Sequence, residues 1–155
     1  MKIKTLFVLL MLTLHFSLTA KNQEMVDLYK YVIEDYYNES IKNGNLSEHD
    51  TFYLIWCFYD CYDDCFGYDI KFDNDKIQFK MPEVSANQPS VIVHKLNTPE
   101  LEGQSILISI SPYRVKYNGE NKDKGIIYSE TTTYIFKYNC KKSKYELKEK
   151  KEYGL

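Results

Sequence analysis

The chain has no hydrophobic run long enough to cross a membrane as a helix. Its longest uncharged apolar stretch is Thr5–Leu14, about half of the roughly 20 residues that a transmembrane helix needs. Two lysines precede this stretch, and the small residue Ala20 follows it in a chain that has only one other alanine, Ala86. These are the features of a secretory signal peptide. The alternatives are an uncleaved anchor and a buried helix.

The sequence therefore predicts cleavage between Ala20 and Lys21, which removes residues 1–20 and leaves residues 21–155 as one domain. The mature protein is expected to be exported, either periplasmic or secreted, and to keep no stable membrane anchor.

The chain also lacks the short motifs of common catalytic chemistry. It has no H-E-x-x-H pair, no G-x-S-x-G elbow, no phosphate-binding glycine loop and no dinucleotide fingerprint. Only His49 and His94 remain after cleavage, and alternation with Val91 and Val93 predicts that His94 is a partly exposed sheet residue. No catalytic residue, metal ligand or cofactor is predicted, and the sequence favours a protein that is not an enzyme.

An excess of positive charge is absent as well. The formal net charge of −2 becomes −4 when the two lysines of the signal peptide are removed, which argues against a general nucleic-acid binder. Residues 21–75 hold thirteen acids and four lysines, whereas residues 76–155 hold fourteen bases and nine acids. This asymmetry indicates either an interaction surface or two halves that neutralise each other by packing together.

Four cysteines are present: Cys57, Cys61, Cys65 and Cys140. An even number of cysteines in an exported protein indicates disulfides. The first three are spaced four residues apart and share a face of a helix or a strand, so the simplest long-range bridge joins one of them to Cys140. The alternative, a zinc or iron–sulfur centre, usually has tight C-x₂-C pairs, which this chain does not have.

Two charged clusters are candidates for contact surfaces. Asp60, Asp63 and Asp64 form an acidic segment whose D-x-x-D-D spacing differs from that of a calcium loop, and a solvated acidic turn is the simpler interpretation. A basic C-terminal hairpin contains seven lysines: Lys137, Lys141, Lys142, Lys144, Lys148, Lys150 and Lys151. An anionic partner and the protection of an edge strand against aggregation are alternative explanations for these lysines.

Periodicity predicts one amphipathic helix followed by strands. Apolar residues recur at helical spacing over residues 22–43, and Asn43-Gly44 is a suitable end. Residues 51–59 are ambiguous. Ser47-x-x-Asp50 resembles a helix capping box, but the aromatic and branched residues that follow favour a strand.

From Gly67 onward the period is two. Predicted strands cover residues 68–72 and 76–80 as a hairpin, and then 90–96, 105–111, 113–117, 126–138 and 144–150. Loops are expected at 82–89 and 118–125, and a bulge or an edge at Pro112. The predicted fold is α+β, with the helix packed on a mostly antiparallel sheet of five to seven strands.

The layout of the mature chain resembles a group of small exported proteins of unknown function from Bacteroidetes-type bacteria. The residues that carry this resemblance are Glu34–Tyr37, Phe52–Ile55, Phe66–Ile70, Ile106–Ile110, Tyr113–Tyr117, Tyr134–Cys140 and Glu152–Leu155. The resemblance implies an outward-facing, periplasmic protein, and it supports a strand at residues 51–59. It implies no activity.

The main hypothesis from the sequence is an exported, non-enzymatic binding or interaction protein whose partner is an unknown protein or small ligand. Its expected contact surfaces are the Asp60–Asp64 segment and an aromatic face of the sheet. One alternative is a periplasmic immunity or inhibitor protein whose acidic half neutralises a basic toxin. Another is a small hydrolase that uses Asp63, Asp64 or His94.

Export is directly testable. Mass spectrometry of the protein from its native host is expected to show a chain that begins at Lys21, because a signal peptidase cuts after a small residue that follows the apolar segment. A soluble cytoplasmic protein that retains Met1 would contradict the prediction.

Overall fold

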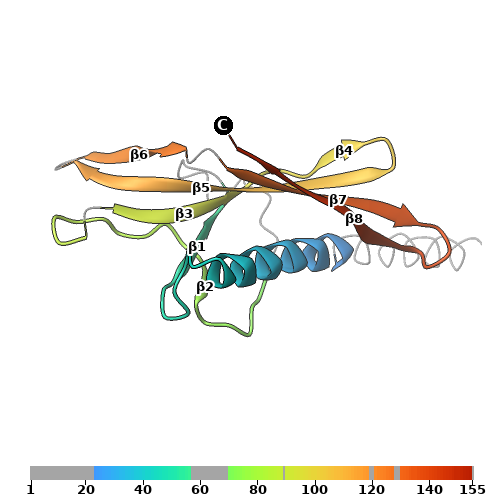
Figure 1. The fold of residues 1–155 in the computed structure, drawn as a ribbon, viewed down its shortest axis with the longest axis horizontal. Helices are drawn as coiled ribbons and strands as arrows, with labels where there is room; N and C mark the ends of the chain where they lie inside the picture. The colour runs from blue at the N-terminus through green and yellow to red at the C-terminus, as the bar shows by residue number, and fades with distance from the viewer. Residues whose placement is uncertain (1–22, 57–69, 89, 119–120, 128–129, 155) are drawn as a thin grey trace, which may run out of the picture.

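The computed structural model describes residues 23–56, 70–88, 90–118, 121–127 and 130–154. Within these ranges, one helix over residues 23–42 and one mixed sheet, mostly antiparallel, form an α+β fold (Figure 1). The strands are β1 (Phe52–Ile55), β2 (Ile77–Phe79), β3 (Ser90–Leu96), β4 (Glu100–Glu102), β5 (Ser105–Asn118), β6 (Asn121–Ile127), β7 (Thr131–Asn139) and β8 (Lys144–Tyr153). Within the described residues the sheet has eight strands, more than the five to seven expected, and neither the short β4 nor a separate β6 was predicted.

Several predicted features lie outside the described residues: the signal peptide with Ala20 and Lys21, Cys57, Cys61, Cys65, Asp60, Asp63 and Asp64. Among the residues that are described, no helix is both long enough and apolar enough to span a bilayer.

Strand β5 is the centre of the sheet. One of its edges pairs with β4 and β3, and the other pairs with β7 and β6. Pro112 lies between the last β7 pair (Ile110–Thr132) and the first β6 pair (Tyr113–Ile127). The Ser109 carbonyl accepts a hydrogen bond from the Asn97 N–H on the β3 edge, so backbone alternation turns the Pro112 nitrogen to the opposite edge.

The Pro112 nitrogen therefore faces the break between β7 and β6, which follow one another along this edge of β5. No pairing strand needs the N–H that proline lacks at this point, so β5 continues through Pro112. Of the two alternatives expected at Pro112, the bulge is wrong, because the register shift of β5 lies between Arg114 and Lys116, against β6. The other alternative, an edge, agrees with the position of Pro112 between the β7 pairs and the β6 pairs.

The first strands pair differently from the prediction. Strand β1 confirms the strand predicted at residues 51–59, of which residues 51–56 are described. It runs parallel to both of its neighbours, β2 and β3. The predicted hairpin of residues 68–80 is wrong for the described part, because residues 70–76 form no strand and β2 pairs with β1. A parallel partner comes from a distant part of the sequence, so local alternation does not reveal it.

The turn before β1 also differs from its sequence pattern. The Ser47 N–H donates to Asp50 Oδ2 at 3.1 Å, and the Asp50 N–H donates to the Ser47 carbonyl at 3.0 Å. These reciprocal bonds resemble a capping box, but they close a turn that leads into a strand.

The helix ends where the sequence predicts. Gly44 has a φ of +73°, the left-handed conformation in which glycine has no steric penalty. The Gly44 N–H donates to the Ile41 carbonyl and the Asn45 N–H donates to the Ser40 carbonyl, both at 2.9 Å. This pair of bonds is a Schellman motif, which satisfies carbonyl groups of the last turn.

Two hydrophobic clusters lie on opposite faces of the sheet. The larger one joins the helix to side chains of β1, β5 and β7, and its members with zero exposure include Tyr29, Val32, Phe52, Ile108 and Tyr134. The smaller one contains Ile55, Val84, Val93 and Val115, so the predicted loop after Pro82 covers the face away from the helix. Both faces of the central strands are therefore covered.

The hairpin of β7 and β8 binds the helix through Lys150, whose Nζ contacts Asp35 Oδ2 at 3.0 Å and also Glu39 Oε2. The Tyr134 hydroxyl donates to the same Asp35 oxygen at 2.9 Å. Burial alone would lower the pKa of Lys150, but its hydrogen bonds to Glu39 and Asp35 raise that pKa overall. The pKa of Tyr134 is raised by burial and by its hydrogen bond to Asp35.

A β-bulge places Lys150 on the helix side of the sheet. Ile135 pairs with Glu149 and Phe136 pairs with Leu147, so Lys148 is an extra residue in β8. Side chains alternate between faces along a regular strand, so Leu147 and Lys150 would otherwise point to opposite faces. The extra residue places both on the helix face, opposite Phe136 and Tyr134.

Two boundaries near the end of the chain differ from the prediction. Residues 121–125 were expected in a turn but belong to β6, and the predicted strand 126–138 is divided between β6 and β7. The last strand continues beyond the predicted Lys150 to Tyr153.

Replacing Lys150 by Met should lower the free energy of unfolding by about 1–2 kcal/mol, because Asp35 and Glu39 would then lie together without a counter-charge. Lys151→Met is the matched control on the same strand, since the ion pair of Lys151 with the described residues is a surface pair with Glu149. This change should cost less than about 0.5 kcal/mol. Urea unfolding measures both. Equal losses in the two variants would contradict the assigned role of Lys150.

Candidate functional site

A cleft of about 240 Å³ lies between the end of the helix and the open end of the β7–β8 hairpin. The helix and the turn after it contribute Tyr36, Glu39, Ser40, Asn43 and Asn45, and the hairpin and the residues next to it contribute Glu130, Thr132, Glu152 and Gly154. Thr132 pairs directly with Glu152 across the two strands, which brings both strands to the same place. All but Gly154 of these nine residues carry polar side chains, which indicates a polar ligand.

The cleft is electrically negative. It contains three carboxylates, and only Glu39 has a cationic partner, Lys150, among the described residues. Burial, together with the charges of Glu130 and Glu152, raises the pKa of Tyr36 to about 12. Two carboxylates without a counter-charge therefore act on one phenol in the cleft.

The end of the helix adds to this negative potential. The C-terminal end of a helix carries a partial negative charge, which favours cations nearby. The Ser40 hydroxyl donates to the Tyr36 carbonyl at 2.8 Å, so its oxygen still has acceptor capacity. The amides of Asn43 and Asn45 supply further acceptors, since the side-chain oxygen of asparagine has two lone pairs.

The Tyr36 ring packs against the buried His94 ring. The two rings meet edge to face with centroids 5.5 Å apart, and His94 stacks on Phe52 at 4.1 Å. His94 is only 7% exposed, and its Nδ1 lies 3.4 Å from the Tyr53 carbonyl oxygen. The prediction of a partly exposed His94 is therefore wrong, because the helix covers this face of β3.

Cys140, the one predicted cysteine that is described, is exposed in the turn after β7 and has no disulfide partner among the described residues. Its expected partners lie outside the described residues, so the bridge to Cys57, Cys61 or Cys65 stays a prediction, as does any role of Asp60, Asp63 and Asp64. The described residues contain no group of three or more His, Cys, Asp or Glu arranged to hold a metal ion.

Sequence reasoning did not find the cleft. Its carboxylates come from the last helical turns, from the residue before β7 and from the end of β8, and no local motif connects them. The final hairpin is the one sequence feature that points to part of the cleft. Once the register of its strands is set, Glu152 must lie beside Thr132.

Searches among protein-family models, curated proteins and solved structures found no match to this chain. The resemblance to small exported proteins therefore stays a prediction.

The buried His94 predicts a specific loss of stability in acid. Burial is the main cause that lowers its pKa from 6.5 to about 4, and the contact with Tyr53 offsets only part of this effect. The unfolded chain then binds a proton below about pH 6.5 while the folded protein does not, so stability falls as the pH drops from about 6.5 to 4. Protonation of His94 lowers the free energy of unfolding by at most about 3 kcal/mol over this range.

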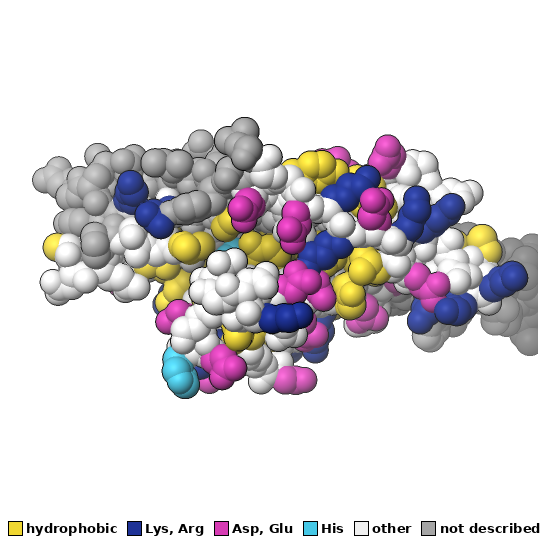
Figure 2. All heavy atoms as spheres, viewed as in Figure 1, with side chains coloured by type: hydrophobic (Ala, Val, Ile, Leu, Met, Phe, Trp, Pro, Cys, Tyr) yellow, Lys and Arg dark blue, Asp and Glu magenta, His cyan; other side chains and the backbone are white. Residues whose placement is uncertain are grey.

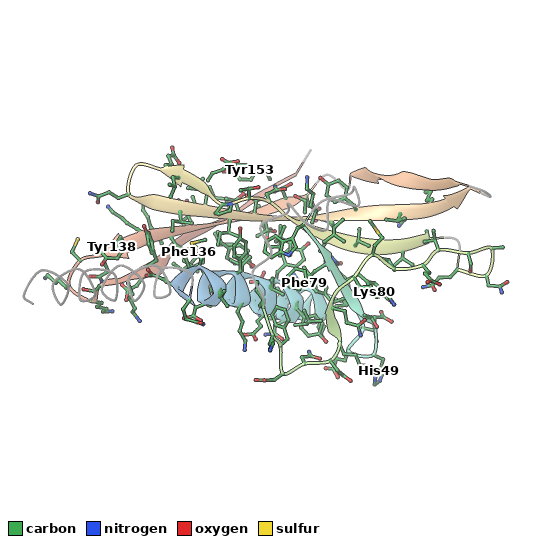
Figure 3. All side chains as sticks on the ribbon, turned by 180° about the vertical axis from the view of Figure 1, so that it is seen from behind. His49, Phe79, Lys80, Phe136, Tyr138 and Tyr153 are labelled. Carbon is green, nitrogen blue, oxygen red and sulfur yellow. The ribbon has the colours of Figure 1, made fainter. Side chains whose placement is uncertain are left out.

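Urea unfolding between pH 7 and pH 4 checks this expectation. His94→Gln should flatten the profile in this range, since glutamine does not titrate. His49→Gln is the control, because His49 lies exposed on a turn (Figure 3) and should leave the slope unchanged. If His94→Gln keeps the full acid dependence, another group causes it.

Proposed function

We propose that the mature protein is an exported, non-enzymatic binding protein whose cleft holds a positively charged group of its partner. The observation that carries this proposal is the convergence of Glu130, Glu152 and the Tyr36 hydroxyl on one hollow. A carboxylate without a counter-charge interacts favourably with an ammonium or guanidinium group, and such pairs guide partner choice and association rate.

The chemistry of the cleft favours binding over catalysis. Tyr36 has a pKa of about 12, far from the range near neutral pH in which general acids and bases are most efficient. His94 is packed in the core beneath Tyr36 and has its pKa lowered to about 4. The hydrolase hypothesis would therefore depend on Asp63 and Asp64, which lie outside the described residues.

The immunity or inhibitor hypothesis is a special case of the same site. A basic toxin could place a lysine or arginine against Glu130 and Glu152, and electrostatic steering would speed the encounter. The salt dependence of the association rate with a captured partner distinguishes this case, because steering weakens strongly as ionic strength rises.

The test is a titration of the mature chain with a blocked tripeptide, acetyl-Gly-Lys-Gly-amide, monitored by NMR. The peptide is expected to shift the signals of residues that line the cleft. Glu130→Gln/Glu152→Gln should weaken binding by about tenfold or more, because it removes both unpaired carboxylates.

A matched control is Glu48→Gln/Glu83→Gln, which changes the net charge by the same amount at two exposed positions away from the cleft. This control should bind like the wild type. If both double variants lose the same affinity, only net charge matters and the cleft is not the site. Absence of any binding by the wild type would also overturn the proposal.

A further inference from the structure

The turn end of the β7–β8 hairpin carries positive charge that the fold does not use. Residues 137–148 contain five lysines and one glutamate. Glu146 binds Lys142 at 2.7 Å and also accepts a hydrogen bond from Asn139. The other four lysines have exposed side chains and no ion pair with the described residues: Lys137, Lys141, Lys144 and Lys148.

The protection of a sheet edge explains only some of these lysines. Lys144 and Lys148 belong to the edge strand β8, where charge discourages pairing with other chains. Lys141, however, lies in the turn, where there is no strand edge to protect, and its N–H and that of Lys142 are held by the Asn139 side chain. The turn is a formed structure that presents lysines beyond the sheet.

Exposed apolar side chains lie at the same end of the molecule. One row crosses four strands in the order Leu101, Ile106, Phe136 and Leu147. The two inner residues are buried, but Leu101 is 79% exposed and Leu147 is 40% exposed. Tyr138, 38% exposed, lies two pairs nearer to the turn than Phe136 and Leu147.

The figures show this end of the molecule from two sides. Tyr138 and Phe136 lie at one end of the sheet, and His49 and Lys80 lie toward the other (Figure 3). Lys and Arg side chains gather around the end where Figure 1 places the β7–β8 turn, with apolar and acidic side chains among them (Figure 2).

We propose that this end of the protein docks reversibly on a membrane surface of anionic lipid. Lysines close to such a surface are attracted by the lipid headgroups, and neighbouring Leu and Tyr side chains can enter the boundary between headgroups and acyl chains. A soluble polyanion would use the lysines but would gain little from Leu101 and Leu147. The combination of both features favours the lipid surface.

Docking at this end leaves the cleft accessible. The turn and the cleft occupy opposite ends of the same hairpin, whose strands have nine and ten residues, or about 30 Å at the usual rise of a strand. The protein can then present the cleft away from the membrane.

The experiment is co-sedimentation of the mature chain with vesicles made of equal parts phosphatidylglycerol and phosphatidylcholine, or of phosphatidylcholine alone. Binding is expected only to the anionic vesicles, and it should weaken as salt is added. Lys141→Gln/Lys144→Gln should lower the partition coefficient by about tenfold or more. Leu101→Ser should lower it while the salt dependence stays the same.

Lys42→Gln/Lys80→Gln is the matched control, because it removes the same charge at exposed positions away from the turn. Circular dichroism verifies that each variant is folded. The proposal is overturned if the anionic vesicles bind no protein or if both lysine pairs lose affinity equally. It is also overturned if Leu101→Ser has no effect while dextran sulfate binds as tightly as the vesicles, since the partner would then be a soluble polyanion.

Discussion

The fold depends on β5 being paired along both of its edges. Because side chains alternate along this strand, its residues divide between two covered faces. Ile106, Ile108 and Ile110 lie under the helix, whereas Val115 packs with Val84 on the other face. The polar residues of that second face are paired as well: Ser109 and Ser111 exchange hydroxyl hydrogen bonds with Thr133 and Thr131 at 2.8 and 2.9 Å.

One charged contact and one irregularity add to the apolar packing that holds the helix on this sheet. The bulge in β8 turns Lys150 toward the helix, where it meets Asp35 and Glu39. The same irregularity places Glu152 on the helix face beside Thr132, where both line the cleft. Regular alternation from Leu147 would have sent both side chains to the opposite face. The bulge that brings Lys150 to the helix therefore also brings Glu152 to the candidate site.

The sequence predicted the elements whose information is local. The helix over residues 23–42 is followed by Gly44 in the left-handed conformation, as expected, and helical spacing of apolar residues was enough to define it. Strand β3 matches its predicted range, because a period of two was enough to define it. It failed where the partner is distant. Strand β2 pairs in parallel with β1. Local alternation in residues 68–80 predicts a hairpin because it carries no information about this distant partner.

His94 illustrates the same limit at the level of burial. Its neighbours Val91 and Val93 suggested one buried and one solvated face, which is typical of an antiparallel sheet with one open side. In this protein the helix covers the face of His94, while the segment around Val84 covers the face of Val93. A sheet covered on both faces gives no reliable exposure pattern along a single strand.

The charge asymmetry of the sequence is partly internal to the fold. Asp35 and Glu39 of the acidic half share Lys150 of the basic half as their cationic partner, and Glu24 accepts a hydrogen bond from the Tyr145 N–H. The charges that remain are distributed differently from the two halves of the sequence. Glu130 and Glu152 belong to the basic half but lie in the acidic cleft. The lysines without an ion pair to any described residue lie at the opposite end of the same hairpin. Since a charge already paired within the fold attracts a partner only weakly, these leftover charges, rather than the net charge, determine what the protein can bind.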